Sequence, residues 1–369
     1  MRVVKVPLGT RSYLIKIGSG LLDRLGAEVR PLGLGRRCAV ITDDRVGPIY
    51  AARVERSLAD AGFETITVTV PAGEKSKRLE MVARCYDHLA KHRIERKSFV
   101  VALGGGVVGD LAGFVAATYL RGVGFVQVPT SLLAQVDSSV GGKVGVNLPA
   151  GKNLVGAFYQ PRLVLCDQEV FATLPRRQFS AGLAEVIKYG IIYDAAFFRR
   201  LERDLDQLLA LDASTLAGVV ARCCAIKAEV VGQDETESGL RAILNFGHTI
   251  GHAFEAISRY GRYLHGEAIA IGQVAAARLS RQQSGLSAAE AQRIQVLLER
   301  AGLPTAASAK GQEIERLLAA MRLDKKVSDG QVKFVLARKI GEVLWGQAVP
   351  EALIRQTLAD LADQPRTQE

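Results

Sequence analysis

Histidine is scarce in this chain, and the positions of its histidines are the first sign of chemistry. There are five histidines among 369 residues, and two of them, His248 and His252, are spaced so that they can share one face of a helix. The surrounding segment, 244–255, is rich in small and apolar residues and contains no lysine or arginine, and His265 follows shortly after it. Imidazole and carboxylate groups are ligands that Zn²⁺ accepts, so this cluster predicts a zinc site. The spacing alone nominates His248 and His252 as the ligand pair.

A second histidine pair, His88 and His92, has the same spacing but different surroundings. Lysines and arginines occupy positions 91, 93, 96 and 97. Because these positive charges repel a divalent cation, we interpret this pair as part of a solvated surface.

A run of glycines suggests a different chemistry, the binding of phosphate groups. Residues 104–110 read Gly-Gly-Gly-Val-Val-Gly-Asp, after an apolar run at 98–103 and before a helix-like segment at 107–118. The spacing G-x-G-x-x-G lets a backbone approach a pyrophosphate, whose charge the helix N-terminus attracts. Two features depart from the usual pattern: the run does not follow the first strand, and Gln127, rather than an acidic residue, lies about 20 positions on. A structural turn rich in glycine is the alternative.

Charged residues in apolar or glycine-rich surroundings mark further segments. Glu185 and Lys188 lie on one face of an otherwise apolar helical segment, as an ordinary ion pair or as part of a site. Segments 135–143 and 151–153 combine lysines with glycines, as loops that bind anions do. The segment 73–77 carries both charge signs, but by itself it would pass for the capped start of a helix.

The composition of the chain limits the kinds of partner that it is expected to bind. The formal net charge is +10, but the basic residues are scattered and aromatic residues make up only 6%, which argues against a nucleic-acid-binding protein. A cationic cleft for a small anionic substrate and a generally arginine-rich proteome explain the charge equally well. No apolar run approaches the ~20 residues of a membrane-spanning helix. The five cysteines form no CxxC pair, which favours free thiols and a cytoplasmic location.

The elements that must position these residues change character along the chain. In the first half, helix-like segments alternate with short strand-like runs, at 37–42, 64–70, 98–103 and 124–128. This alternation is typical of a doubly wound α/β sheet. After about residue 175, long helical segments dominate, and 332–336 is the exception that looks like a strand. We therefore expect a doubly wound α/β nucleotide-binding domain at 1–175 and an all-α domain, which binds metal and substrate, at 176–369.

Taken together, these segments resemble the sugar-phosphate cyclases, and most closely the 3-dehydroquinate synthase family. The similarity extends from about residue 40 to 335, and the motifs follow the family's order: 104–110, 137–143, 151–153, 185–188, 245–252 and 265–267. Each motif alone is unspecific, but the combination is very specific. The resemblance implies a homodimeric enzyme with NAD and Zn²⁺ (or Co²⁺) as cofactors.

The resemblance changes the expected zinc ligands. In the family, a glutamate and two histidines hold the metal, which implies Glu185, His248 and His265 here. His252 would then serve in substrate binding and proton handling. Three protein ligands leave open positions for a substrate, as a catalytic zinc requires.

The same resemblance implies roles for the remaining site residues. Catalytic roles fall on Lys152, Lys188, Arg241, Asn245 and His252. Substrate contacts fall on Asp137, Lys143, Asn153, Lys227, one lysine of the Lys325–Lys326 pair (Lys326 is preferred) and Arg121, which would act across a dimer interface. NAD contacts fall on Asp43, Glu74, Lys77, Gly105, Gly106, Val107, Asp110, Thr130, Ser131, Lys143 and Lys152.

The implied reaction explains the cationic residues. The family's substrate, 3-deoxy-D-arabino-heptulosonate 7-phosphate, carries a carboxylate and a phosphate, and is converted to 3-dehydroquinate and phosphate in the shikimate pathway. The reaction proceeds by transient oxidation by NAD, β-elimination of phosphate, reduction, ring opening and aldol closure, in this order. The protein's main tasks are therefore to position the substrate and to stabilise charge.

Other functions remain as alternatives. Another sugar-phosphate cyclase would act on a substrate without the carboxylate, and Lys227 and Arg241, which suit a carboxylate, count against it. Iron-dependent alcohol or glycerol dehydrogenases share the implied fold but consume NAD. A binding module without activity would leave the implied metal ligands unexplained.

Overall fold

The computed structural model describes residues 1–258, 262–307, 311–322 and 332–361. Two compact units emerge from the internal packing of the chain. The first comprises Met1–Leu174 and Leu211–Thr236, and the second comprises Pro175–Ala210 and the described residues from Glu237 onward.

The composition of the units differs from the single boundary expected at 175/176. Helix α7 (Ala213–Gln233) was expected in the helical domain, but it belongs to the first unit. The physical reason is its packing, since α7 lies against strands β1 (Arg2–Val6) and β2 (Tyr13–Gly18). The chain therefore leaves the first unit after residue 174 and returns to it for one helix.

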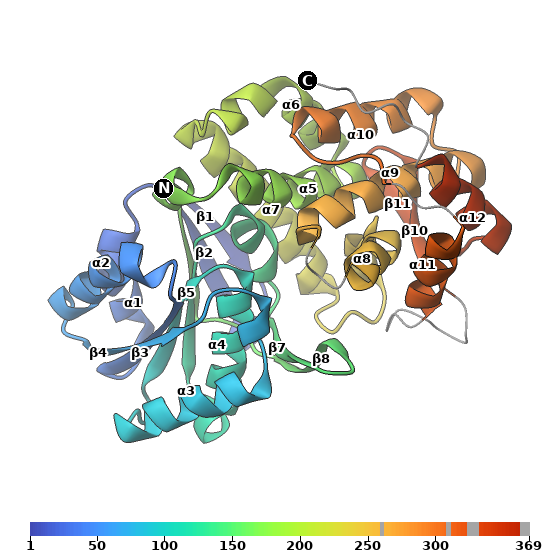
Figure 1. Ribbon diagram of the computed structural model, residues 1–369. Coiled ribbons are helices and arrows are strands. Elements are labelled where there is room, and N and C mark those ends of the chain that lie inside the picture. Colours follow the sequence, from blue (N-terminus) through green and yellow to red (C-terminus); the bar gives the residue numbers. More distant parts are fainter. Residues whose placement is uncertain (259–261, 308–310, 323–331, 362–369) are drawn as a thin grey trace. The chain divides into compact units, whose positions relative to one another are not determined.

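A seven-stranded sheet forms the centre of the first unit (Figure 1). The strand order is β1-β2-β9-β6-β5-β3-β4, and every neighbouring pair is parallel except β1 and β2. The other strands are β3 (Arg37–Asp43), β4 (Glu64–Val70), β5 (Phe99–Gly104), β6 (Gly124–Pro129) and β9 (Leu163–Asp167). The strand-like runs read from the sequence are β3 to β6, so the α/β prediction is confirmed.

Helices cover both faces of this sheet, as a doubly wound fold requires. Successive side chains of a strand point to opposite faces. On β3, Ala39 and Ile41 join a buried apolar cluster, to which α3 (Leu79–Lys91) and α4 (Gly106–Thr118) contribute. Thr42 points to the other face of the sheet, toward α2 (Gly47–Asp60). A Cβ on Gly47, the first residue of that helix, would lie 2.9 Å from the Thr42 methyl group. The short helix α1 (Leu25–Val29) packs on α2.

The sheet has a topological switch point at β3. Strands β4 and β5 lie on its two sides, so the chain winds away from β3 in both directions. In open α/β sheets, ligands bind outside the carboxyl ends of the strands at such a point. A separate antiparallel hairpin, β7 (Lys143–Leu148) and β8 (Gly151–Phe158), packs against α4.

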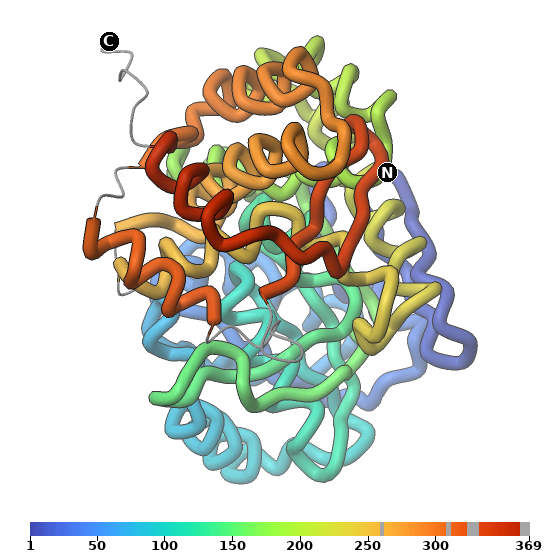
Figure 2. Tube along the Cα trace, turned by 90° about the vertical axis from the view of Figure 1, so that its right-hand side faces the viewer, coloured from blue at the N-terminus to red at the C-terminus, as the bar shows by residue number. Residues whose placement is uncertain are grey.

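The second unit is mainly helical, as predicted. Its helices are α5 (Arg176–Ile192), α6 (Ala195–Leu209), α8 (His248–Ile257), α9 (His265–Gln283), α10 (Ala288–Arg300), α11 (Gln312–Arg322) and α12 (Glu351–Asp360). Helix α9 lies beside α5, α8 and α10 (Figures 1 and 2).

The expectation of an all-α second domain is wrong in one place. The strand-like run at 332–336 becomes β10 (Lys333–Lys339), which pairs antiparallel with β11 (Glu342–Ala348). Gly341 makes the turn between them possible, because its φ of 93° lies in the left-handed region that favours glycine.

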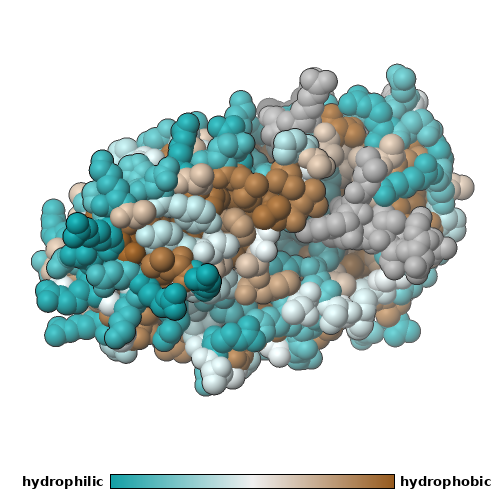
Figure 3. Space-filling model, turned by 90° about the horizontal axis from the view of Figure 1, so that it is seen from below, coloured by the Kyte–Doolittle hydropathy of each residue, from teal (hydrophilic) through white to brown (hydrophobic). Residues whose placement is uncertain are grey.

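In the part of the chain that the structure describes, no helix is long and apolar enough to cross a membrane. On the face shown in Figure 3, hydrophilic side chains predominate and hydrophobic ones form separate patches.

Candidate functional site

Helices α5, α8 and α9 bring three of the predicted metal ligands together. Glu185 lies in the middle of α5, and His248 and His265 are the first residues of α8 and α9. The Oε1 atom of Glu185 lies 3.5 Å from His248 Nε2 and 3.6 Å from His265 Nε2. One ligand atom of each residue lies within 4.8 Å of the others. We call these three residues the metal-ligand set.

Hydrogen bonds at the far side of each imidazole orient the two histidines. The Nδ1 group of His248 donates to the carbonyl oxygen of Phe246 over 3.2 Å, and His265 Nδ1 donates to Glu255 Oε2 over 3.1 Å. Metal-ligating histidines are usually held in this way, which fixes the tautomer and leaves the other nitrogen for the metal. The donor set and its orientation therefore fit a divalent metal ion such as Zn²⁺.

A second group of potential ligands shares one histidine with the first. His252, Glu255 and His265 also have ligand atoms within 4.8 Å of one another. Since the Nδ1 atom of His265 is engaged by Glu255, its Nε2 atom is available to the metal-ligand set. Among the described residues, no such group contains both His248 and His252. The two histidines nominated by spacing alone therefore fall into different groups of potential ligands.

Glycines allow these helices to approach closely enough. A Cβ on Gly266, next to His265, would lie 1.8 Å from the carbonyl oxygen of Ala181 on α5. Ala181 is one helical turn before Glu185, so this backbone contact places α9 beside the glutamate. On α8, a Cβ on Gly251 would lie 2.7 Å from the side chain of Ile269 on α9. Larger residues at these positions would force the ligands apart.

The charges around the metal-ligand set are strongly coupled. Lys188 is 1% exposed and Glu185 is fully buried, and the Lys188 ammonium forms an ion pair with Glu185 Oε2. Burial lowers the pKa of His265, but its hydrogen bonds to Glu185 and Glu255 and their charges outweigh burial and raise that pKa to about 10. A metal ion that binds here must displace the proton of His265.

Other predicted residues of the second unit lie in α8 or in the segment before it. Arg241 is 1% exposed. The amide of Asn245 donates to Glu237 Oε1 over 3.0 Å. The ring of His252 lies 5.2 Å from that of His248 and 6.0 Å from that of His265, measured between centroids. Lys326 lies outside the described residues.

In the first unit, the predicted NAD residues follow the carboxyl ends of four neighbouring strands. Asp43 ends β3, Glu74 and Lys77 follow β4, the glycines follow β5, and Thr130 and Ser131 follow β6. The carboxyl ends of parallel strands meet at one edge of a sheet, so these segments form one region, which we call the carboxyl edge. It includes the switch point at β3.

The glycine run has the local structure that binding of a pyrophosphate requires. Gly105 precedes α4, and Gly106 and Val107 are the first residues of that helix. The third glycine of the pattern, Gly109, packs on β6, where a Cβ would lie 2.7 Å from Gln127 Oε1. Gln127 therefore packs against the glycine helix, in place of the ribose-binding acid that the usual pattern has near that position.

Two polar networks lie beside this edge, and Lys77 is their buried member. The Lys77 ammonium pairs with Asp110 and donates to Asn153 Oδ1 over 2.5 Å. Burial raises the pKa of Asp110, and Lys77 opposes that shift. Glu74 accepts from the Asn147 amide over 2.7 Å and lies 4.0 Å from Lys152 Nζ.

Three of the predicted NAD residues, Asp43, Thr130 and Ser131, also form hydrogen bonds with nearby backbone groups. The carboxylate of Asp43 accepts from the backbone N–H groups of Arg45 and Val46, both at 2.9 Å, at the start of α2. The Thr130 N–H donates to Gly104 O over 2.9 Å, and Ser131 Oγ accepts from the N–H of Ala134.

The predicted substrate residues of the first unit fall into two groups. Lys227 of α7 donates to Asp137 Oδ1 over 2.6 Å, so these two predicted residues are partners. Lys143 and Arg121 are exposed, and Arg121 has a φ of 65°. His88 and His92 are exposed, which confirms their interpretation as surface. The five cysteines are buried and free, as predicted.

Sequence reasoning missed Glu255, Glu237 and Asn147. Glu255 is the only acidic residue in the apolar segment 244–255, and that contrast was a signal. Asn147 had none, because the hairpin pairing of β7 and β8 is what puts it beside Asn153, whose N–H donates to its side chain over 2.9 Å.

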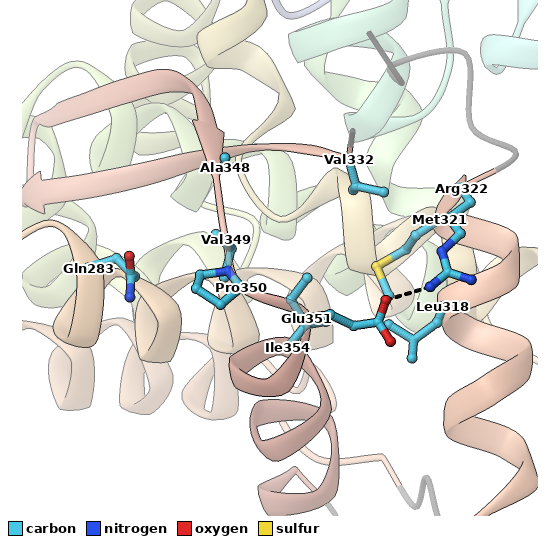
Figure 4. A pocket seen from close by; sticks show the side chains of 10 residues that line it. All are labelled: Gln283, Leu318, Met321, Arg322, Val332, Ala348, Val349, Pro350, Glu351 and Ile354. Atoms are coloured by element: carbon cyan, nitrogen blue, oxygen red, sulfur yellow. Dashed lines mark hydrogen bonds and ion pairs between the residues drawn. The ribbon is translucent and has the colours of Figure 1, made fainter. Parts of the chain in front are cut away.

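The second unit also contains a cavity of about 480 Å³ (Figure 4). It lies between α11, α12 and the strand ends, and an ion pair between Arg322 and Glu351 crosses it. None of its lining residues belongs to the predicted site.

Comparisons with known proteins give the family. The model described as 3-dehydroquinate synthase N-terminal matches residues 67–181, and the one described as 3-dehydroquinate synthase C-terminal matches residues 182–327. Relatives named 3-dehydroquinate synthase from Desulforamulus reducens and Nitrosomonas europaea are 51% and 50% identical to the chain. The alignments cover 97% and 95% of this chain, and 100% and 94% of those proteins.

Solved structures of other enzymes have a similar fold. A crystal structure of 2-deoxy-scyllo-inosose synthase, complexed with carbaglucose-6-phosphate, NAD+ and Co2+, is 25% identical, with a TM-score of 0.88 over 97% of this chain and 100% of that one. The 2-epi-5-epi-valiolone synthase of Streptomyces hygroscopicus, with NAD+ and Zn2+ bound, is 27% identical, with a TM-score of 0.87 over 98% and 99%. A probable glycerol dehydrogenase from Sinorhizobium meliloti, 17% identical with a TM-score of 0.67 over 94% and 96%, shares the fold.

Proposed function

Because the chain belongs to the 3-dehydroquinate synthase family, we propose that it converts 3-deoxy-D-arabino-heptulosonate 7-phosphate to 3-dehydroquinate and inorganic phosphate. The observation that carries this proposal is the metal-ligand set with its buried Lys188, in a chain that is 51% identical to a 3-dehydroquinate synthase over nearly its whole length. In this function the protein is a carbon–oxygen lyase of the shikimate pathway.

We propose that Glu185, His248 and His265 hold one Zn²⁺ or Co²⁺ ion. When bound, the ion would act as a Lewis acid that lowers the pKa of substrate hydroxyl groups. Glu255 and the carbonyl of Phe246 keep the two imidazoles in place. Lys188 neutralises part of the carboxylate charge and is itself held for contact with an anionic substrate.

We propose that NAD binds at the carboxyl edge. The N-terminus of α4, with Gly105, Gly106 and Val107, suits a pyrophosphate because backbone N–H groups and the helix dipole attract negative charge. The other residues proposed to hold NAD are Asp43, Glu74, Lys77, Asp110, Thr130, Ser131, Lys143 and Lys152. When bound, NAD would accept a hydride and return it.

The remaining charged residues suit the two anionic groups of the substrate. We propose that Lys152, Asn153, Lys188, Lys227, Arg241 and Asn245 bind and orient it, together with Asp137, Lys143 and Lys326. Positively charged and hydrogen-bonding groups that are fixed in advance stabilise developing charge without reorganisation. His252 lies beside the metal-ligand set, where its imidazole can hold or pass on a proton.

We propose that the enzyme acts as a homodimer in the cytoplasm, with Arg121 reaching the substrate of the neighbouring subunit. Leu120 and Arg121 have successive positive φ angles of 51° and 65°, so the chain turns sharply and the arginine is exposed. Mixing inactive Arg121→Ala protein with inactive Lys152→Ala protein should restore some active sites if the subunits exchange. No recovery despite demonstrated exchange would place Arg121 in its own subunit's site.

The activity assay follows phosphate release and product formation from the heptulosonate phosphate by the metal-loaded protein. We expect equal amounts of phosphate and 3-dehydroquinate, and loss of both after removal of the metal by a chelator. Turnover of a sugar phosphate that lacks the carboxylate, in place of the acid, would instead indicate one of the other cyclases. Oxidation of simple alcohols would indicate a dehydrogenase.

A further inference from the structure

A buried glutamine on α9 has no part in the proposed reaction, yet its contacts lead to the metal-ligand set. Gln273 is 0% exposed, and it is the only polar side chain in the otherwise aliphatic segment 268–277. Its Oε1 atom has no hydrogen-bond partner among the described residues. A buried amide that is only partly hydrogen-bonded costs stability that an apolar side chain would not cost, so stability alone does not explain a glutamine here.

The other end of the amide ties α9 to α5. The Nε2 group of Gln273 donates to the carbonyl oxygen of Ala184 over 2.9 Å. Ala184 lies inside α5 and directly precedes Glu185. Because a carbonyl inside a helix already accepts a bond from the next turn, α5 does not need the glutamine to satisfy its backbone. The bond instead fixes the position of the backbone just before the carboxylate ligand.

The same residue also supports the backbone before the first histidine ligand. Gly247 precedes His248, and a Cβ on Gly247 would lie 2.7 Å from both the Cγ and the backbone nitrogen of Gln273. A Cβ on the neighbouring Gly272 would lie 2.0 Å from the carbonyl oxygen of Gly247. The start of α8 therefore rests directly on α9 at this point.

We infer that Gln273 is a positioning residue for the metal-ligand set. It fixes the backbone before Glu185 relative to the backbone before His248, and so the 3.5 Å separation of Glu185 Oε1 and His248 Nε2. The third ligand, His265, begins the same helix as Gln273. This inference rests on the proposed metal site, because it assigns Gln273 a role only through the ligands of that site.

The test compares metal affinity with stability in two variants. Gln273→Met keeps the length of the side chain but cannot donate to Ala184, and Gln273→Asn keeps the amide on a shorter side chain. The affinity for Co²⁺ is measured by competition with a chelator, together with the visible spectrum of the bound Co²⁺ and the thermal midpoint of the metal-free protein. We expect the affinity to fall about 10-fold or more in both variants, with a changed Co²⁺ spectrum. The thermal midpoint of Gln273→Met should stay close to that of the wild type.

Ser280→Ala is the matched control, since Ser280 is another buried polar residue of α9. Its hydroxyl donates to Ala276 O and accepts from the N–H of Ala337, neither of which adjoins a metal ligand. We expect this variant to have a lower thermal midpoint and an unchanged Co²⁺ affinity and spectrum.

Three results would overturn the inference. Wild-type affinity and spectrum in both Gln273 variants would show that the glutamine does not position the ligands, and if Gln273→Met does not fold, Gln273→Asn decides alone. A loss of affinity that follows the loss of stability in all three variants would show a merely structural role. If the wild-type protein itself binds no divalent ion, the proposed metal site fails, and that failure is recognised before any variant is compared.

Discussion

The carboxyl edge of the first unit collects its residues from the ends of four parallel strands, whereas the metal-ligand set of the second unit collects three side chains from three helices. At the edge, the register of the sheet places Asp43, Gly104 and Pro129 near the ends of adjacent strands before any side chain is considered. In the metal-ligand set, Gly266 and Gly251 let α9 lie close to α5 and α8, and this close packing brings the three side chains together. The first region depends on topology, and the second depends on close packing.

Removal of a metal ligand should have the largest effect in either region. Glu185→Ala and His265→Ala should each lose the bound metal and activity together, because the ion's contribution of several kcal/mol corresponds to on the order of 1,000-fold in kcat. Elemental analysis and phosphate release measure the two losses. His252→Ala is the comparison variant, which should keep its metal and lose turnover. Full metal occupancy in His265→Ala would refute the ligand assignment.

A larger side chain at the contact between α5 and α9 should lower the metal affinity of the metal-ligand set, although no proposed ligand is replaced. In Gly266→Ala the new methyl group would meet the Ala181 carbonyl, 1.8 Å away, so α9 must move from α5. We expect a loss of about 1–3 kcal/mol in the free energy of unfolding and about a 10-fold or greater loss of metal affinity. Denaturant unfolding and Co²⁺ titration measure both. An alanine variant with unchanged metal affinity would mean that this contact does not set the ligand spacing.

Alanine substitutions at two glycines of the carboxyl edge should have different effects, one on NAD affinity and the other on the stability of the fold. A Cβ on Gly105 meets only Ser131 Oγ, at 3.6 Å, whereas a Cβ on Gly109 would lie 2.7 Å from Gln127 Oε1. Gly105→Ala should therefore keep the stability of the fold and bind NAD about 10-fold more weakly, a difference of about 1.4 kcal/mol, since the methyl group obstructs the pyrophosphate. Gly109→Ala should lose about 1–3 kcal/mol of stability. Calorimetric titration with NAD and thermal unfolding distinguish the two, and equal NAD affinity in Gly105→Ala and the wild type would argue against the proposed site.

The smallest effect is expected from replacing the second histidine pair, whose spacing would suit a metal site but whose surroundings are basic and exposed. His88 and His92 are exposed on the surface of α3 and just after it. The double variant His88→Ala, His92→Ala should change stability by no more than about 0.5 kcal/mol. The number of metal ions bound per chain should stay the same. A drop in metal stoichiometry would show that spacing alone suffices to bind a metal in this protein.

The strands and the glycine run of the carboxyl edge could be read from the sequence itself, whereas the other proposed NAD residues came from the family resemblance. Strand-like runs and the glycines after them follow one another along the chain, so parallel topology alone assigns them to one edge. Spacing within one helix paired His248 with His252, because contacts between helices leave no local pattern. The assignment of Glu185 and His265 came from the family resemblance.

Two buried polar residues could be recognised as unusual from the sequence, but their hydrogen-bond partners could not. Gln273 stands alone in an aliphatic run, and Glu255 is the only acid of its segment, so both could have been singled out as unusual. Their partners, Ala184 and His265, lie on other helices and could not be read from the sequence. Helix α7 was misplaced for a similar reason, since nothing in its own sequence shows that it packs on β1 and β2.

The most direct test of the account follows phosphate, 3-dehydroquinate and NADH together, with NAD present far below the concentration of the heptulosonate phosphate. If NAD at the carboxyl edge and the metal at Glu185, His248 and His265 serve one cyclisation, NAD is used again in every turnover. We expect one phosphate and one 3-dehydroquinate per substrate consumed, many turnovers per NAD, and no accumulation of NADH. NADH formed in proportion to the substrate consumed, without release of phosphate, would contradict it and identify a dehydrogenase.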